Sequence, residues 1–276
     1  MPREIIFARH GQSEANIVQK RDDHGIDRAT TQEIFARPDW LNRLSMLGVK
    51  QAQRARKVIE AELGGLESFD ALYVSPFMRT RETAAHIGGD DVTGWTIDDR
   101  LVERSWGIYG KMPRAEQRAQ FPLTAEEKLR NPWYASLDGG ESMPDVSGRF
   151  RDFQGTLHRE QSDKRVFVVT HGDFINVARY NIERMVPEQW EEIDADQEFV
   201  IRNCMMYHCT RQNPDNPTDI RQKIRWVRYI NPLDRAAAPY GGEWAELTDR
   251  KRFTGADLRQ QVEHAPRLLV DLNQEI

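Results

Sequence analysis

The amino-acid sequence predicts an α/β fold, a three-layer sandwich in which helices cover both faces of a mostly parallel central sheet. Two short, uninterrupted apolar runs, residues 5–8 and 166–169, are typical of strands that are buried on both faces. Between them, the apolar residues of 45–63 fall on one stripe of an amphipathic helix. Strands that alternate with helices in this way favour a parallel sheet.

The first 43 residues are expected to contain a strand, a helix and an insertion. The strand covers 4–8, and the helix starts near Ser13, a residue type that caps the amino ends of helices. Residues 19–43 are highly polar and contain Pro38, so we interpret them as a long insertion with a short helix around 31–37. This insertion could form one wall of a site.

The alternation continues after the insertion. The amphipathic helix begins at Ser45 and ends before Gly64, because glycine is common just after a helix end. A strand at 70–74 and a helix at 78–87 follow it. Residues 101–103 fit a strand and a loop equally well.

The second half of the chain contains the strongest strand pattern, 166–170, which suits a central position in the sheet. Residues 139–146 are expected to form a loop that enters a helix ending near residue 161. A second insertion is expected at about 111–138, with short helices interrupted by prolines. The other predicted elements are helices at 114–120, 125–129 and 173–185 and strands near 198–201, 204–209 and 224–230.

These elements predict one domain over 1–232, followed by a C-terminal extension, 233–276, that packs on the domain. The extension is polar apart from 268–272. Its apolar residues 268–270 could serve the contact of a possible homodimer.

The composition excludes several classes of function. With 30% charged residues and a formal net charge of -5, the chain has no overall basic field for nucleic acid. No apolar run approaches the roughly 20 residues that span a bilayer, and the first strand begins without a signal peptide, so we expect a cytoplasmic protein with no membrane partner. Cys204 and Cys209 form no metal or disulfide pattern and the histidines lack zinc-site spacing, so neither a metal nor a cofactor is expected.

Basic and hydroxyl side chains follow three of the predicted strands. Arg9 and His10 come after the first, Ser75 and Arg79 after the strand at 70–74, and His171 after the strongest one. Because the carboxyl ends of parallel strands meet at one edge of a sheet, these groups are expected to surround one crevice. Arginines and histidines in such a crevice suit a tetrahedral anion, which we interpret as phosphate. A neutral imidazole that faces the phosphorus can form a phosphohistidine.

Five segments appear in order along the chain: RHGQSEAN from Arg9, SPFMRTRETA from Ser75, LVERSWGIYG from Leu101, GGES from Gly139 and THG from Thr170. Together they resemble the signature of the histidine phosphatase superfamily, in its phosphoglycerate mutase-like branch. The resemblance spans about residues 4–210, and five ordered motifs are far more specific than any one of them.

The resemblance implies catalytic roles for five residues. His10 matches the family's nucleophile, which becomes phosphorylated, and Arg9 and Arg79 match the phosphate clamp. His171 matches the second histidine, which hydrogen-bonds the phosphoryl oxygens. Glu103 matches the acid that protonates the leaving alkoxide and then, as a carboxylate, activates water.

Three further residues complete the expected substrate-binding set. Asn16 matches an amide near the phosphate, Gly172 follows the second histidine, and Arg104 adds to a basic pocket. Without the flanking pattern, Glu103 could simply form an ion pair with Arg104 or Arg100. The remaining candidates lack such contexts and are interpreted as exposed or structural: Arg81, His24, His86, His158, His208 and His264.

The resemblance leaves two enzyme activities open. The segment between Glu103 and Gly139 resembles the cap of broad phosphatases and lacks the adjacent arginine pair that glycolytic mutases carry there. We therefore expect a metal-independent phosphomonoesterase that hydrolyses a small phosphorylated metabolite through phospho-His10. The alternatives are a 2,3-bisphosphoglycerate-dependent phosphoglycerate mutase and a non-catalytic protein that binds a phosphorylated ligand.

Overall fold

The computed structural model describes residues 1–25, 29–263, 265 and 267 of the chain. Within them, a single sheet has the strand order β3-β2-β4-β1-β5-β6-β7. The strands β1 to β4 are mutually parallel, and β5 to β7 extend the sheet in antiparallel fashion. The prediction of a mostly parallel central sheet is therefore confirmed. The strands are β1 (Glu4–Arg9), β2 (Ala71–Val74), β3 (Trp95–Ile97), β4 (Arg165–Thr170), β5 (Met206–Thr210), β6 (Trp226–Ile230) and β7 (Ala245–Glu246).

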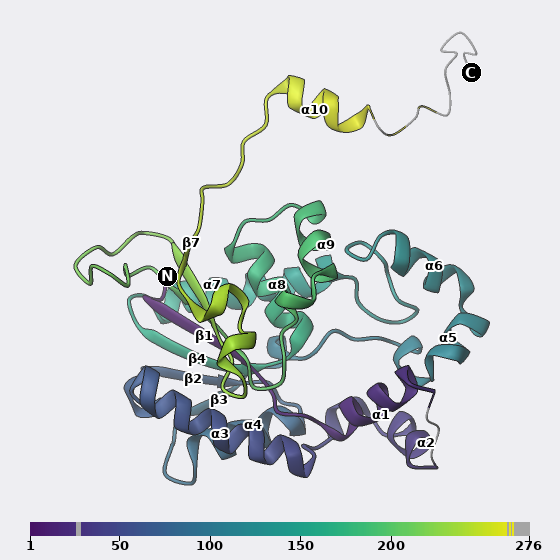
Figure 1. Ribbon diagram of the computed structural model, residues 1–276, viewed down its shortest axis with the longest axis horizontal. Coiled ribbons are helices and arrows are strands. Elements are labelled where there is room, and N and C mark those ends of the chain that lie inside the picture. Colours follow the sequence, from purple (N-terminus) through teal and green to yellow (C-terminus); the bar gives the residue numbers. More distant parts are fainter. Residues whose placement is uncertain (26–28, 264, 266, 268–276) are drawn as a thin grey trace.

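Helices cover both faces of this sheet, as predicted. Figure 1 shows α3 and α4 on one side of the strands and α7 and α8 on the other. The helices of the described residues are α1 (Glu14–Asp23), α2 (Ala29–Ala36), α3 (Met46–Leu63), α4 (Met78–Gly88), α5 (Arg114–Gln120), α6 (Pro122–Arg130), α7 (Met143–Glu160), α8 (Gly172–Ile182), α9 (Pro187–Ala195) and α10 (Gly255–Val262).

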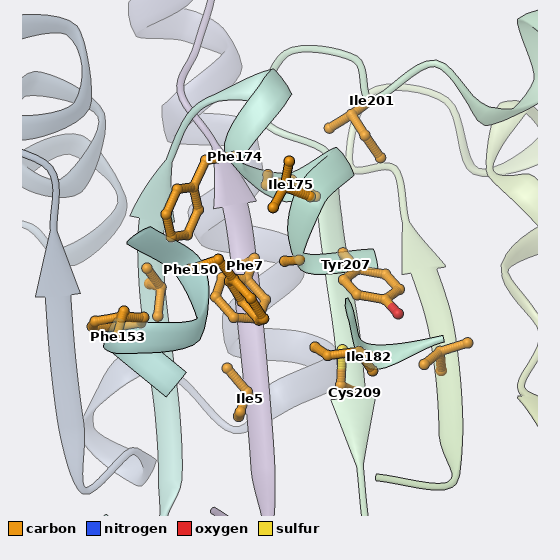
Figure 2. Packing of buried hydrophobic residues seen from close by; sticks show 14 of the residues in the cluster. Ile5, Phe7, Phe150, Phe153, Phe174, Ile175, Ile182, Ile201, Tyr207 and Cys209 are labelled. Atoms are coloured by element: carbon orange, nitrogen blue, oxygen red, sulfur yellow. The ribbon is translucent and has the colours of Figure 1, made fainter. Parts of the chain in front are cut away.

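Successive residues of β1 and β4 belong to two different hydrophobic cores, because neighbouring side chains of a strand point to opposite faces. Ile5 and Phe7 pack with aromatic residues of α7 and α8, including Phe150 and Phe174 (Figure 2). The intervening Ile6 joins the core beneath α3 and α4. The continuous apolar run of the sequence thus reflects a strand that is buried on both sides.

Serine residues start three of the helices that the sequence predicts. Ser13, Ser45 and Ser142 each accept a hydrogen bond from a backbone N–H in the first turn of the helix they cap. Pro122 lies in the first turn of α6, where its missing N–H removes no helical hydrogen bond. The predicted short helix at 125–129 is accordingly longer, because it starts at this proline.

The prediction of a strand near 198–201 is wrong. Gln197–Phe199 forms the 3₁₀ helix η5, because the Asp196 carboxylate accepts a hydrogen bond of 2.9 Å from the Glu198 N–H and turns the chain. The next strand begins at Met206, after Cys204 has taken a left-handed conformation with φ of 59°. Of residues 101–103, which the sequence left undecided, Leu101 ends the 3₁₀ helix η3 (Asp99–Leu101), and the two residues after it form a loop.

The C-terminal extension contains two structurally different parts. Its first part joins the domain, because β7 pairs with β6 and Leu247 is buried in the core that contains Phe7. By contrast, α10 has no buried residues and projects away from the sheet in Figure 1. The apolar residues 268–270 of the expected homodimer contact lie outside the described residues, as does His264. No described helix is long and apolar enough to cross a membrane.

Candidate active site

The carboxyl ends of β1, β2 and β4 lie side by side and open into one pocket. In the register of the sheet, Arg9 pairs with Thr170 and Val74 pairs with Val169, so the residues that follow these strands are neighbours. The pocket has a volume of about 780 Å³. It is lined by Arg9, His10, Asn16, Arg79, Glu103, Arg104 and Gly172, together with residues of both insertions.

His10 is buried and has one ring nitrogen engaged. Its Nδ1 lies 2.7 Å from the carbonyl oxygen of Gly11. A carbonyl can only accept, so Nδ1 carries the hydrogen and Nε2 keeps its lone pair. Burial and the positive charges of Arg79 and Arg9 lower the pKa of His10 well below its ordinary value, which keeps the ring neutral at pH 7.

The backbone at Gly11 is fixed from two sides. Its N–H donates to the Thr83 hydroxyl at 3.0 Å, and this hydroxyl donates to the carbonyl oxygen of Arg79 at 2.6 Å. On the other side, a Cβ at position 11 would come within 2.6 Å of the carbonyl oxygen of Gly48. The ring of His10 is therefore oriented by a loop that α3 and α4 hold in place.

His171 lies beside His10, with ring centroids 5.2 Å apart. Its Nε2 is 2.8 Å from the Ser75 hydroxyl, whereas its Nδ1 is buried without a hydrogen-bond partner among the described residues. Burial first, and then the charge of Arg79, lowers its pKa well below the ordinary value. When Ser75 donates to Nε2, the Nδ1 hydrogen is available to a ligand.

Two arginines flank the histidines. Arg9 donates from Nη1 to the carbonyl oxygen of Ile201, and its buried Nε has no partner among the described residues. A Cβ at Gly172 would lie 3.5 Å from the guanidinium of Arg9. The amino end of α8 is therefore close to this cation. Arg79, in the first turn of α4, forms a bidentate ion pair with Asp39.

The Glu103 carboxyl is half-buried beside these groups and makes no ion pair with Arg104 or Arg100 in the described chain. Its Oε1 accepts from the backbone N–H groups of Arg104 at 3.0 Å and Asp173 at 3.2 Å. Burial first, and then the charge of Asp173, raises the pKa of Glu103 to about 7, although Arg79 opposes this shift. Near neutral pH the group can therefore either donate or accept a proton.

Two cations lie at the opposite wall of the pocket, Lys128 from the second insertion and Arg104 from the segment before it. The Nζ of Lys128 lies 4.1 Å from the ring centre of Trp106, and the guanidinium of Arg104 lies 5.1 Å from it. Burial and the charge of Arg104 lower the pKa of Lys128 to about 8. Arg104 itself is buried and donates to the carbonyl oxygens of Glu141 and Ala135, which ties this wall to the domain.

Asn16 reaches the pocket from α1. Its Oδ1 accepts from the Ser13 N–H at 3.1 Å and from Asn203 Nδ2 at 3.3 Å, and Asn203 also donates to the carbonyl oxygen of His10. The side-chain oxygen of Asn16 thus connects the helix cap to the loop of His10.

The residues interpreted from the sequence as exposed or structural do not line the pocket in the described part of the chain. Arg81, His24 and His158 are exposed. His208 is buried in the middle of β5, where its Nε2 lies 2.6 Å from Glu4.

Two imidazoles and a carboxylate are close enough to hold a metal ion as well as a phosphoryl group. Ligand atoms of His10, Glu103 and His171 all lie within 4.8 Å of one another. The adjacent guanidinium groups favour an anion over a cation at this point, because like charges repel.

A family model described as the histidine phosphatase superfamily (branch 1) matches residues 5–210, about three quarters of the chain. The chain belongs to the histidine phosphatase superfamily. This agrees with the resemblance carried by the five sequence motifs.

Among the relatives of this superfamily member are enzymes of two kinds. A 2,3-bisphosphoglycerate-dependent phosphoglycerate mutase of Azorhizobium caulinodans is 30% identical over 194 residues, which are 68% of this chain and 85% of the mutase. Phosphoserine phosphatase 1 of Hydrogenobacter thermophilus is 28% identical over 167 residues, 60% of this chain and 70% of the phosphatase. The superfamily assignment therefore supports a phosphoryl-transfer enzyme and leaves its type open.

A solved structure shows the same fold. Phosphoserine phosphatase from Entamoeba histolytica, in complex with 3-phosphoglyceric acid, superposes with a TM-score of 0.56 at 20% identity, covering 76% of this chain and 91% of that chain. At this identity the likeness concerns the fold alone.

No role was assigned from the sequence to three residues that line the pocket, Asp39, Lys128 and Asp173, or to the buried Thr83, which holds the loop of His10. Thr83 lies inside the quoted SPFMRTRETA segment, so its spacing of four residues from Arg79 on a helix was a usable signal. Asp173 directly follows the THG segment. Asp39 and Lys128 lie in the insertions, where no regular pattern indicates which side chains face the pocket.

Proposed function

We propose that this protein is a phosphomonoesterase that transfers the phosphoryl group of a small phosphorylated metabolite first to His10 and then to water. The observation that carries the proposal is the state of His10. The ring is neutral, its Nδ1 hydrogen is directed to Gly11, and its Nε2 lone pair is free beside two arginines. Such a nitrogen is a nucleophile, whereas a protonated ring is not.

Donors in the same pocket are available for the phosphoryl oxygens. The buried Arg9 Nε and His171 Nδ1 have no hydrogen-bond partner among the described residues, and a buried polar group without a partner is unfavourable. Oxygens of a phosphoryl group would satisfy both, with Arg79 as a second cation and Gly172 leaving room next to Arg9. Asn16 and Arg104 would contact the rest of the substrate.

The reaction needs two proton transfers, which we assign to Glu103. In the first step Nε2 of His10 attacks the phosphorus, the ester P–O bond breaks, and the leaving oxygen takes the proton of Glu103. In the second step the resulting carboxylate removes a proton from water, the water oxygen attacks the phosphorus, and the P–N bond breaks to release inorganic phosphate. A pKa of about 7 suits a group that must act in both directions.

A phosphoglycerate mutase is the second candidate, and two observations favour it. The mutase of A. caulinodans is 30% identical to this chain. Lys128 and Arg104 also place positive charge at the wall of the pocket, where the carboxylate of a phosphorylated acid could bind. A protein that only binds phosphorylated ligands would need neither the free nucleophile nor the adjacent acid, so we rank it last.

The catalytic domain in this proposal is 1–232, with insertions at about 19–43 and 111–138 that form walls of the pocket, and 233–276 is an extension. A cytoplasmic location and a homodimer stay predictions.

The test is phosphate release from p-nitrophenyl phosphate and a panel of phosphorylated metabolites, in the presence of EDTA. Turnover that His10→Ala abolishes and the exposed control His158→Ala retains would support a metal-independent phosphatase. Interconversion of phosphoglycerates after priming with the bisphosphate, without net phosphate release, would support the mutase. Turnover that EDTA abolishes would contradict both assignments and direct attention to a metal held by His10, Glu103 and His171.

A further inference from the structure

Arg79 has an acidic partner that comes from the first insertion. The Nη1 of Arg79 donates to the Asp39 carbonyl oxygen at 2.9 Å and to Oδ1 at 3.0 Å, while Nη2 donates to Oδ2 at 3.0 Å. Asp39 is the first residue of the 3₁₀ helix η1 (Asp39–Leu41). An exposed segment is thus bonded through one residue to a guanidinium that is itself buried.

The surroundings of this ion pair restrict the position of the guanidinium. Its central carbon lies over the ring of Phe77, 4.8 Å from the ring centre. The amide of Asn42, a buried residue, donates to Asp39 Oδ1 at 3.3 Å and so helps to fix the carboxylate. Asp39 therefore binds Nη1 and Nη2 of a guanidinium that already lies over the ring of Phe77.

The geometry leaves one edge of Arg79 available. A guanidinium has five N–H donors, and Asp39 uses both of those on Nη1 and one of those on Nη2. The two that remain, on Nε and Nη2, lie on the same edge of the planar group and can bind two oxygens of a phosphoryl group side by side. The ion pair is thus compatible with phosphate binding.

Exposure distinguishes this arrangement from one in which Asp39 occupies the phosphate site. The Asp39 side chain is 57% exposed, whereas that of Arg79 is 5% exposed. In the described part of the chain, the carboxylate of Asp39 contacts Arg79 and Asn42 and makes no hydrogen bond with Arg9, His10 or His171. Asp39 thus binds Arg79 from the solvent-exposed side and does not contact the two histidines of the site by a hydrogen bond in the described chain.

We propose that Asp39 is a positioning residue that orients the free edge of Arg79 toward the phosphoryl group bound at His10. This inference rests on the proposed function of the site. It gives the first insertion a specific task, because the insertion supplies the group that orients the phosphate clamp.

The first experiment measures the affinity of the whole protein for inorganic phosphate by calorimetry, which needs no turnover. We expect Asp39→Ala and Asp39→Asn to weaken phosphate binding roughly tenfold, and to raise KM more than they lower kcat, because a misoriented clamp loses ligand contacts. Asp39→Glu, which keeps the charge, should recover part of the affinity. Glu14→Gln is the matched control, since it removes an exposed carboxylate of the same region that pairs with Arg37.

A double-mutant cycle identifies the partner. In an Arg79→Ala background, Asp39→Ala should have no further effect on phosphate affinity. Tighter phosphate binding by Asp39→Ala would overturn the proposal and show that Asp39 competes with the ligand. If Asp39→Ala weakened phosphate binding equally in the wild type and in the Arg79→Ala background, the proposal would also be overturned. Phosphate binding that depends on both residues in a protein without phosphatase turnover would contradict the proposed function and leave the positioning role intact.

Discussion

At the scale of single residues, the site contains a neutral nucleophile, His10, and an acid, Glu103, whose proton is retained up to a pH of about 7, and both properties have the same physical reason. Burial disfavours charge of either sign, so it lowers the pKa of His10 and raises that of Glu103. Neighbouring charges then strengthen both effects, since Arg79 acts on the histidine and Asp173 acts on the glutamate. A free nucleophile and a proton donor can therefore coexist at the same pH.

Glu103→Gln tests the role of this proton donor. We expect kcat to fall by about 10² to 10⁴ on an alkyl phosphate, whose leaving oxygen needs a proton. The loss should be much smaller in the first step on p-nitrophenyl phosphate, because a nitrophenolate leaves without protonation. Burst kinetics with both esters measures this step, and equal losses would show that Glu103 is not the acid.

The pH dependence of stability tests the protonation of Glu103 independently of catalysis. The pKa of Glu103 is about 7 in the folded protein and near its ordinary value of 4.5 in the unfolded chain. The folded state thus binds more protons between these pH values, so this group's contribution to stability is present at low pH and is lost as the pH rises toward 7. In urea titrations, Glu103→Gln should become more stable relative to the wild type as the pH increases through this window. An unchanged difference would contradict the raised pKa.

At the scale of elements, the catalytic loop after β1 depends on the close approach of two helices. Gly11 touches the backbone of Gly48 at the start of α3 and is hydrogen-bonded to Thr83 of α4. The orientation of the His10 ring is therefore set by packing between elements, in addition to the local turn.

Gly11→Ala should consequently destabilise the protein by about 1 to 3 kcal/mol, because its Cβ would meet the Gly48 carbonyl oxygen at 2.6 Å. Activity should fall as well, since the same loop orients His10. The matched control is Gly148→Ala in α7, where an added Cβ has nothing within 4 Å and alanine should stabilise the helix by about 0.5 to 1 kcal/mol. Chemical denaturation measures both changes. A neutral effect of Gly11→Ala would show that the loop can move away from α3.

The elements that position the site could be predicted because their signals are local. Continuous apolar runs indicate β1 and β4, and the capping residues Ser13, Ser45 and Ser142 indicate where three helices start. The signals of other elements are weaker. The edge strand β3 has three residues in a turn-rich segment, and the apolar residues near 199 are bent into η5 by a side-chain hydrogen bond of Asp196.

The same distinction applies to the residues of the site. Arg9 ends β1, and Ser75 and His171 directly follow β2 and β4, so the parallel sheet alone brings them together. Asp39 and Lys128 reach the pocket through insertions whose path depends on tertiary contacts, and no spacing in the sequence shows that they face Arg79 or Trp106. Positions fixed by the sheet were thus predictable, whereas those fixed by loop packing were not.

At the scale of the whole molecule, the sheet separates two hydrophobic cores and is extended beyond the family match by strands from the C-terminal part. The match ends at residue 210, yet β6 and β7 follow it in the sheet. Leu247, just after β7, is buried in the core that contains Phe7, while Leu258 on α10 is 51% exposed. Packing with the sheet and its core therefore extends through Leu247 of the C-terminal extension.

Alanine substitutions at these two leucines test that boundary. Leu247→Ala should lower the free energy of unfolding by about 2 kcal/mol, because it removes buried apolar contacts. Leu258→Ala should change it by less than about 0.5 kcal/mol. Thermal and urea unfolding measure both. Equal effects would place α10 within the cooperative unit.

The hydrogen bonds between Asp39 and Arg79 also have a thermodynamic consequence for the first insertion. If the orientation of Arg79 favours an anion, then by reciprocity the bound anion must favour the conformation of η1 that orients Arg79, by the same free energy. The insertion and the phosphate site are then linked equilibria. Binding of phosphate should slow amide hydrogen exchange in η1, at a distance from the ligand, and removal of the Asp39 carboxylate should uncouple the two.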